Sequence, residues 1–380
     1  MSLFPAGLGL YVHWPYCARI CPYCDFNVYR ARGRDEAPLL DAIIADLRGH
    51  AARMGEREAE TLFLGGGTPS LLSPQGIERL IAAARESFAL RDDAEITLEA
   101  NPEDRANFAA FRAAGINRLS IGVQSLRDDA LKALGRTHDA AAAREAAEMA
   151  ARTGARVSLD LIYAREGQTA DEWAAELREA LALPAEHLSL YQLTIEERTA
   201  FGRAVRRGKL KPPESEEAAR FYELTQEICD AAGMPAYEIS NHARTAEGRS
   251  RHNFLYWRGA EWIGIGPGAH GRVRIDGQRL ATTALDRPET YIEAVQANSV
   301  GWESADPLSH EECAKEVLVM GLRTSEGVSR SSVASILDEE QAEVLCRQGF
   351  LRVTPTHLIL TPQGRLLADR IAAELTKGSA

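Results

Sequence analysis

The sequence predicts an α/β protein: a partly closed parallel β/α barrel, followed by a small α+β lobe that resembles a winged helix. Short apolar or β-branched runs alternate with Ala-, Arg- and Glu-rich stretches of helical periodicity, such as 139–153 and 170–182. Repeats of a strand followed by a helix favour parallel strands joined by right-handed crossovers. The predicted strands are 9–14, 61–67, 95–102, 118–125, 156–163 and 187–195.

Length and composition limit the class of protein. At 380 residues, with 45% hydrophobic and 26% charged side chains, the chain can form one large domain and a smaller one. Its formal net charge of -11 repels phosphate backbones, so we expect no nucleic-acid partner. No run approaches the roughly 18 apolar residues of a membrane span, and the N-terminal residues lack the pattern of a signal peptide. The sequence therefore predicts a cytoplasmic protein.

Three parts are predicted along the chain. Residues 1–235 form the barrel, 236–298 form an extension, and 299–380 form the C-terminal lobe. In the lobe, helical stretches lead into two short strands within FLRVTPTHLILTPQG and then a last helix. Residues 305–380 carry 11 acidic and 8 basic side chains, which argues against DNA binding and favours a packing or substrate-covering role. The predicted helices of the lobe are 308–323, 329–336, 338–348 and 363–376.

Three cysteines lie close together directly after the first predicted strand. Cys17, Cys21 and Cys24 form the pattern CxxxCxxC. Structural zinc usually has four protein ligands in two separated pairs, and the sequence offers no second pair of suitable spacing. Three thiolates on one loop fit a 4Fe-4S cluster better, because each holds one iron and the fourth iron stays open to a small molecule. An amino and carboxylate chelate, such as the methionine end of S-adenosylmethionine (SAM), can take that position.

Polar residues and glycines follow the ends of the later predicted strands. In a β/α barrel, the carboxyl ends of the strands form the rim where ligands bind. The glycines of GGGTPS let a ligand approach the backbone closely, since no Cβ is in the way. Each residue alone is typical of a solvated rim, but together with the cysteines they surround one place. The residues are Gly65 to Thr68, Glu99, Asn101, Gln124, Ser125 and Asp160.

Further motifs accompany the cysteines between residues 11 and 271. They are YVHWPYCARICPYCDFN, FLGGGTPS, LEANPED, RLSIGVQS, LGRTHD, SLYQLTIE, YEISN, HNFLYW and GIGPGAHG. With these motifs the chain resembles the radical SAM family of oxygen-independent coproporphyrinogen III oxidases and their relatives, and most closely the HemW-type haem chaperones. The resemblance implies a partial parallel (β/α) barrel of the radical SAM type, with a 4Fe-4S cluster on the three cysteines and SAM beside it.

The resemblance also implies which residues bind SAM. Tyr23, between the second and third cysteines, matches an aromatic residue that lies by the adenine. One stretch departs from the family pattern: Gly-Leu-Pro-Gly-Gln-Thr is usual after DLIY, whereas this chain has AREGQT at 164–169. The positions that match SAM-binding residues are Tyr11, Gly66, Gly67, Thr68, Glu99, Gln124, Arg136 and Asp160.

Phe26 distinguishes two branches of this family. Coproporphyrinogen oxidases carry a fourth cysteine two positions after the third, where this chain has Phe26, and they have a longer N-terminal arm. Only ten residues precede Tyr11, which we take as too few for such an arm. An aromatic side chain cannot replace a thiol in redox chemistry. By resemblance, the chaperone branch keeps three cysteines followed by DFN, as here.

The segment RHNFLYW, residues 251–257, joins a histidine to aromatic side chains. Imidazole is the commonest axial ligand of haem, and tyrosine and tryptophan can cover a porphyrin face. A histidine near aromatic residues is by itself more typical of a hydrogen-bonded core, but the HNxxYW pattern is associated with haem binding in the HemW group. The resemblance therefore makes His252 the leading haem ligand, with His270 of GPGAHG as the alternative. His13 is expected to hydrogen-bond the cysteine loop.

We interpret the chain as a haem-binding chaperone on a radical SAM barrel, with a 4Fe-4S cluster, SAM and haem as its cofactors. Its partners would be apo-haemoproteins, foremost those of the respiratory chain, and the interpretation allows peripheral contact with membrane haemoproteins and a homodimer. Two enzymatic alternatives stay open. One is a coproporphyrinogen III dehydrogenase, and the other is a radical methylase or haem-cleaving enzyme that acts on a tetrapyrrole.

Overall fold

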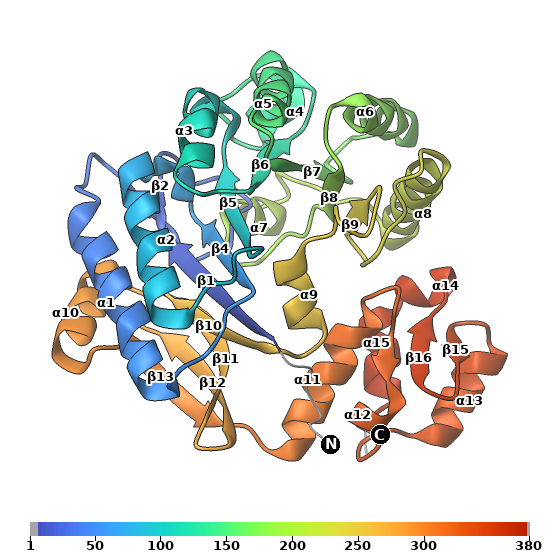
Figure 1. The fold of residues 1–380 in the computed structure, drawn as a ribbon. Coiled ribbons are helices and arrows are strands. Elements are labelled where there is room, and N and C mark those ends of the chain that lie inside the picture. Colours follow the sequence, from blue (N-terminus) through green and yellow to red (C-terminus); the bar gives the residue numbers. More distant parts are fainter. Residues whose placement is uncertain (1–6, 378–380) are drawn as a thin grey trace.

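A computed structural model describes residues 7–377, and an 11-stranded sheet forms its centre (Figure 1). All six predicted strands are present, and neighbouring members pair in parallel. Their alternating apolar residues are buried because helices cover the outer face of the sheet. These strands are β1 (Leu8–Trp14), β4 (Thr61–Gly66), β5 (Glu95–Ala100), β6 (Arg118–Gln124), β7 (Arg156–Tyr163) and β8 (His187–Gln192).

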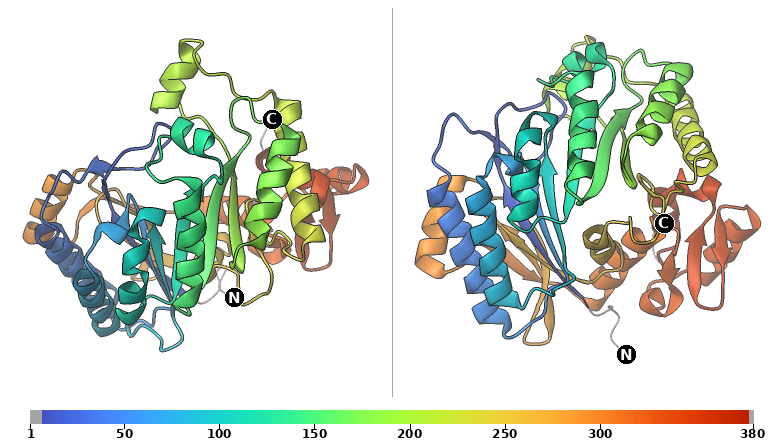
Figure 2. Two further views of the ribbon diagram at one scale, coloured as in Figure 1. Left: turned by 90° about the horizontal axis from the view of Figure 1, so that it is seen from above. Right: turned by 45° about the horizontal axis from the view of Figure 1, so that its top comes forward.

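The sheet continues beyond the predicted strands on both sides. Its order is β13-β12-β11-β10-β1-β4-β5-β6-β7-β8-β9, so it curves without closing, and the predicted partial barrel is confirmed (Figure 2). The strand β10 (Glu261–Ile265) pairs in parallel with β1, and β9 (Asn241–Ala243) pairs antiparallel with β8. The other added strands are the antiparallel β11 (His270–Ile275), β12 (Gln278–Ala284) and β13 (Trp302–Pro307).

Helices α1 to α6 lie along the outer face of the curved sheet (Figures 1 and 2). The predicted helices at 139–153 and 170–182 are confirmed as α5 and α6. Local sequence fixes where helices begin: Thr169 and Glu172 form a capping box at the start of α6, satisfying exposed backbone N–H groups. The helices of the barrel are α1 (Ala37–Met54), α2 (Pro74–Phe88), α3 (Phe108–Ala113), α4 (Asp128–Ala133), α5 (Ala140–Arg152), α6 (Ala170–Ala182), α7 (Ala200–Arg206), α8 (Ser215–Ala231) and α10 (Pro288–Asn298).

The short helix α9 (Arg251–Trp257) contains the HNxxYW motif and lies at the amino ends of β1, β4 and β5. A Cβ on Gly9 of β1 would stand 3.0 Å from a Leu255 methyl group and 3.2 Å from the His252 ring. The glycine therefore lets α9 pack tightly against the strands. Figure 1 shows α9 between the barrel strands and the C-terminal lobe.

The C-terminal lobe has its own apolar core and an antiparallel sheet in the order β14-β16-β15. Helices before a small sheet match the predicted winged-helix-like arrangement, but the last predicted helix, 363–376, is interrupted at Leu366 and Leu367. The lobe packs against α9 through α11, and Arg323 pairs with the buried Glu238 at 2.9 Å. Its elements are α11 (His310–Leu322), β14 (Val328–Ser329), α12 (Arg330–Val333), α13 (Glu339–Arg347), β15 (Leu351–Val353), β16 (His357–Leu360), α14 (Pro362–Arg365) and α15 (Ala368–Glu374).

The predicted division at residues 235 and 298 remains a prediction. The strands between residues 236 and 298 belong to the same sheet as the barrel, and so does β13. Within residues 7–377, no helix is both long enough and apolar enough to cross a bilayer.

Candidate cofactor pocket and inner chamber

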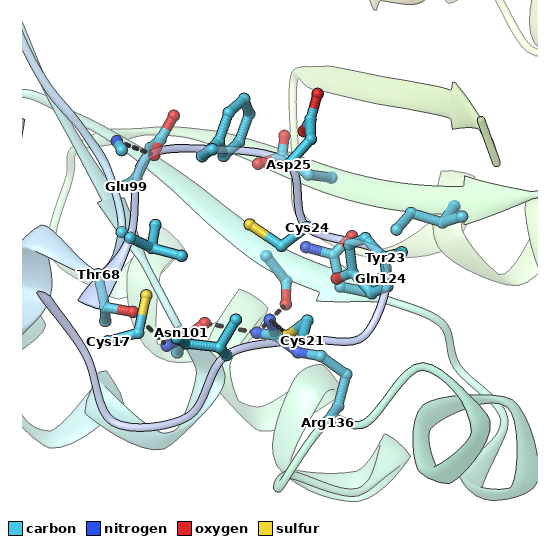
Figure 3. A pocket seen from close by; sticks show the side chains of 18 of the residues that line it. Cys17, Cys21, Tyr23, Cys24, Asp25, Thr68, Glu99, Asn101, Gln124 and Arg136 are labelled. Atoms are coloured by element: carbon cyan, nitrogen blue, oxygen red, sulfur yellow. Dashed lines mark hydrogen bonds between the residues drawn. The ribbon is translucent and has the colours of Figure 1, made fainter. Parts of the chain in front are cut away.

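A pocket of about 440 Å³ opens at the carboxyl ends of the parallel strands; we call it the cofactor pocket. Figure 3 shows the sulfur atoms of Cys17 and Cys24 pointing into the space that the cysteine loop, residues 15–30, partly encloses. The structure thus brings together residues that the sequence places on five different strand ends. The predicted residues that line it are Cys17, Cys21, Tyr23, Cys24, Gly66, Gly67, Thr68, Glu99, Gln124, Arg136 and Asp160.

Hydrogen bonds of two polar side chains anchor the cysteine loop to the barrel. His13 of β1 hydrogen-bonds the carbonyl oxygen of Asn27 through Nε2 at 2.9 Å, as the sequence led us to expect. Asn27, the last residue of the DFN sequence, donates through Nδ2 to the carbonyl oxygens of Pro267 and Asp286. Two short paired strands close the loop, β2 (Tyr16–Cys17) and β3 (Tyr29–Arg30). The three cysteines therefore sit on an anchored loop.

Glycines leave room for this anchor. Gly66 has φ of +105°, and a Cβ there would stand 2.5 Å from the His13 ring. Gly268 of the GPGAHG motif has φ of +78°, and its Cβ would stand 2.5 Å from Asn27 Nδ2. Close packing under the loop thus explains both glycines, in addition to the close ligand approach predicted for GGGTPS. His270 of the same motif is exposed, and its Nδ1 lies 3.3 Å from the Thr283 hydroxyl.

Arg136 of the LGRTHD motif links the loop to the strand ends. Its guanidinium donates to Cys21 Sγ at 3.5 Å, to Asn101 Oδ1 at 2.5 Å and to the Gly122 carbonyl oxygen at 3.2 Å. Asn101 in turn donates to the Thr68 hydroxyl at 3.4 Å. The sequence predicts Asn101 only as a rim residue, because it directly follows the third predicted strand.

Gln124 has a strained backbone in the cofactor pocket. Its φ is +64°, in the left-handed region, and the pairing of β6 with β7 is irregular between Ile121 and Gln124. A non-glycine residue in this region costs roughly 1–3 kcal/mol and persists where the surrounding structure imposes it. Such strain at a pocket residue supports a functional position for Gln124.

Two partly buried carboxyl groups line the cofactor pocket. Glu99 accepts a hydrogen bond from the Gly66 N–H at 3.1 Å, and burial together with the nearby Asp160 raises the pKa of Glu99 to about 8. Asp160 accepts from the Ser120 hydroxyl at 3.0 Å, and burial raises its pKa as well. A positively charged ligand group would favour the ionised forms of both.

The thiols fit a cluster better than a lone metal ion. Burial raises the pKa of Cys24 to about 11 and also raises that of Cys17, so cluster binding would release protons. Among the described residues, no three His, Cys, Asp or Glu side chains stand close enough to hold one ion. Three cysteines around a common pocket, each free to take a different iron, suit a 4Fe-4S cluster.

Below the cofactor pocket, toward α9, lies a second cavity of about 290 Å³, which we call the inner chamber. The predicted residues Tyr11 and His252 line this chamber and not the cofactor pocket. Glu99, Ser120, Asp160 and Tyr191 line both cavities, so the two adjoin. The other residues of the inner chamber are Phe63, Arg118, Ser189, Asn253 and Tyr256.

His252 is buried with both ring nitrogens hydrogen-bonded. Nδ1 lies 2.7 Å from the Thr61 hydroxyl and Nε2 lies 2.6 Å from the Tyr256 hydroxyl, while the ring stacks on Phe63. Burial lowers the pKa of His252 to about 3. Iron ligation through Nε2 would therefore require Tyr256 to move, which the sequence could not indicate.

The departing AREGQT segment adopts a left-handed turn at Ala164, where φ is +57°. The following Arg165 pairs with the buried carboxylate of Glu176 at 2.6 Å and donates to the Ile162 carbonyl oxygen at 2.7 Å. Glu176 also accepts a hydrogen bond from the Leu126 N–H at 2.7 Å. The altered segment is thus tied into the barrel by its arginine.

Two protein-family models match this chain. Residues 11–180 match the Radical SAM superfamily, and residues 308–367 match the HemN C-terminal domain. A Heme chaperone HemW from Mycobacterium tuberculosis is 36% identical over 373 residues, covering 97% of this chain and 94% of its own length. The chain belongs to the HemW family. This confirms the predicted resemblance, and membership of the radical SAM superfamily implies a 4Fe-4S cluster and SAM.

Two further similarities concern a mitochondrial relative and a solved structure. The mitochondrial Radical S-adenosyl methionine domain-containing protein 1 from Bos taurus is 41% identical over 328 residues, covering 84% of this chain and 74% of its own length. The solved structure of coproporphyrinogen III oxidase (HemN) from Escherichia coli, a radical SAM enzyme, has a TM-score of 0.82 at 22% identity, over 98% of this chain and 90% of that one. At this identity the likeness concerns the fold, and it confirms the predicted fold class.

Proposed function

We propose that this chain is a haem chaperone that binds a 4Fe-4S cluster, SAM and haem, and transfers haem to apo-haemoproteins. The observation that carries the proposal is the cofactor pocket with three thiols and, beside them, Phe26. That side chain is 64% exposed at the position where the oxidase branch has a fourth cysteine. Relatives over nearly the whole chain are named Heme chaperone HemW.

In this proposal, Cys17, Cys21 and Cys24 hold the cluster, which supplies an iron open to the amino and carboxylate groups of SAM. The remaining predicted residues bind and orient SAM around that iron. Arg136 places a positive charge beside the Cys21 sulfur, and the partly buried carboxyls of Glu99 and Asp160 suit a positively charged ligand. The proposed SAM-binding residues of the cofactor pocket are Tyr23, Gly66, Gly67, Thr68, Glu99, Gln124, Arg136 and Asp160, together with Tyr11, which lines the adjoining inner chamber.

We place haem on the α9 side of the barrel, with His252 as the proposed axial ligand. The Tyr256 hydroxyl is hydrogen-bonded to His252 Nε2, so haem binding through this nitrogen would displace the hydroxyl. The proposed acceptors are haemoproteins of the respiratory chain, reached in the cytoplasm or at the membrane surface. A homodimer is part of the same proposal.

A transfer assay tests this function. The anaerobically reconstituted protein is loaded with haem and mixed with a respiratory apo-haemoprotein, and the Soret spectrum of the acceptor is followed. We expect haem to pass to the acceptor faster than free haem does at the same concentration. Coproporphyrinogen III, incubated with the protein, SAM and a reductant, should remain unchanged. Catalytic formation of protoporphyrinogen IX would instead place the chain with the oxidases.

A further inference from the structure

The inner chamber contains a buried cation that no part of the proposed machinery uses. Arg118 is the first residue of β6, and only 2% of it is exposed. Its guanidinium makes no ion pair within 4.0 Å and no hydrogen bond with any residue from 7 to 377. Buried charges in proteins are nearly always paired, because taking an ion out of water is costly. A buried arginine that lines a cavity without a close carboxylate therefore suits an anionic ligand group.

The buried carboxylate of Glu95 has close partners other than Arg118. Glu95 on the neighbouring strand pairs with Arg156 at 2.7 Å. It also accepts hydrogen bonds from the backbone N–H groups of Arg251 and His252 at the start of α9. Arg118 and Arg156 are register partners on β6 and β7, yet only Arg156 has a close carboxylate. Despite burial, the charges of Arg118 and Arg156 lower the pKa of Glu95, but the close ion pair is with Arg156, so Arg118 has no hydrogen-bonded carboxylate.

Of the two acidic side chains that line the inner chamber, Glu99 is a poor counter-charge near neutral pH. Burial raises the pKa of Glu99 to about 8 and raises that of Asp160. Asp160 is also occupied by the hydroxyls of Ser120 and Ser158. A protonated carboxyl group donates a hydrogen bond, so Glu99 can assist an anion while it is neutral.

The size and position of the chamber limit what this anion is. A volume of about 290 Å³ lies at the lower end for a whole ligand, which favours a side arm over a macrocycle. The chamber adjoins the cofactor pocket on one side, and His252, Asn253 and Tyr256 of α9 close it on the other. A ligand bound at the α9 motif can thus extend an acidic arm toward Arg118.

We infer that the inner chamber is a carboxylate-binding site in which Arg118 holds a propionate side chain of haem. The planar guanidinium can donate two parallel hydrogen bonds to one carboxylate, a geometry that lysine cannot reproduce. Recognition of a propionate beside His252 would orient the macrocycle relative to α9. The inference rests on the proposed function, since it takes haem as the ligand.

The test compares haem with haem dimethyl ester, whose propionates carry no charge. Both are titrated against the reconstituted wild-type protein and the variants R118Q and R156Q. We expect the wild type to bind haem at least about tenfold more tightly than the diester. In R118Q, haem affinity should fall to the level of the diester while affinity for the diester stays unchanged. R156Q is the matched control, because it removes a neighbouring strand arginine that does not line the chamber, and it should keep the wild-type preference.

The outcomes separate this inference from the function on which it rests. A wild type that binds neither compound contradicts the proposed function. A wild type that binds both equally, or an R118Q variant that keeps the full preference for haem, overturns the inference alone. If R118Q does not fold, R118K is tested instead, because lysine keeps the charge but cannot donate two parallel hydrogen bonds to one carboxylate. Its preference for haem should fall at least about threefold, and an unchanged preference overturns the role of Arg118.

Discussion

The cofactor pocket and the inner chamber share four residues but are built from different parts of the barrel. The cofactor pocket consists of strand ends and the anchored cysteine loop, and it opens to solvent. The inner chamber is lined by strand interiors and by His252, Asn253 and Tyr256 of α9, and its Arg118 is only 2% exposed. The same sheet thus provides an outer site rich in thiols and an inner site that contains a buried arginine. Adjacency through Glu99 and Asp160 means that a ligand in one cavity changes the electrostatics of the other.

The largest expected effect is the loss of one cofactor while binding of the other is retained. Replacing Cys17, Cys21 and Cys24 by alanine should abolish the 4Fe-4S cluster, because the described chain has no other thiol in the pocket. Haem binding should persist, since the inner chamber contains no cysteine. His252→Ala should show the converse, with a full cluster and a weakened or altered haem spectrum. Iron, sulfide and haem titration on the same samples are the measurements.

Two results would contradict this separation. Loss of haem binding in the cysteine variant would show that the cavities function as one site. Unaltered haem affinity and spectrum in His252→Ala would move the ligand role elsewhere, and His270→Ala would be examined next.

The next effect concerns the support of the cysteine loop. Gly268→Ala should lower cluster content severalfold, because the new Cβ would stand 2.5 Å from Asn27 Nδ2, which anchors the loop. Gly277→Ala is the matched control: its φ of +80° is nearly the same, but no atom lies within 4 Å of its Cβ. Both variants carry similar backbone strain, so only the contact differs. Equal cluster content in the two variants would show that the contact is unimportant.

The strand ends and the loop could be predicted from sequence, because glycines, cysteines and polar residues directly after apolar runs identify a rim. The inner chamber could not. Arg118, Ser120 and Ser158 alternate with apolar residues, a pattern that also describes a strand with one face in water. Only the curvature of the whole sheet turns that face inward.

Two features of the extension, residues 236–298, differ in how far the sequence predicts them. The turn at Asp276 and Gly277, where both φ angles are positive, is a strong hairpin signal that predicts β11 and β12 once it is noticed. The hydrogen bond of His252 Nδ1 has no such signal, because Thr61 lies 191 residues away, whereas the partner of Nε2, Tyr256, is four residues along the same helix. The partner of Nδ1 therefore depends on the fold.

Acid should weaken the fold through His252. Its pKa is about 3 in the folded protein and near 6.5 in the unfolded chain, so below about pH 6.5 the unfolded state binds the extra proton. The stabilisation is present above pH 6.5 and is lost as the pH falls toward 3. Between pH 7 and 5 we expect a loss of roughly 1–2 kcal/mol from this residue. Urea unfolding of His252→Gln should show a shallower pH dependence than the wild type, whereas exposed His310→Gln should not.

A smaller effect should follow from freeing the imidazole. Tyr256→Phe removes the hydroxyl that occupies His252 Nε2 but keeps the ring that packs edge-on against it. If His252 ligates haem iron, affinity should rise by about fivefold, corresponding to one net hydrogen bond of roughly 1 kcal/mol. Haem titration by absorbance measures this. A lower affinity would show that the Tyr256 hydroxyl contacts haem itself.

The smallest expected effect is a change in the free energy of unfolding when Ala164 is replaced. Ala164 follows β7, the strand that carries Asp160, and its φ of +57° is unfavourable for any residue with a Cβ. Ala164→Gly relieves a strain of roughly 1–2 kcal/mol but increases the freedom of the unfolded chain by about 0.4–1 kcal/mol, so a net gain of about 0.5–1 kcal/mol is expected. Ala175→Gly, at an exposed position within α6, should instead lose about 1 kcal/mol. Urea unfolding of both variants measures these changes, with cluster and haem content expected to match the wild type. Destabilisation by Ala164→Gly would show that its methyl group packs favourably enough in the core to outweigh the backbone strain.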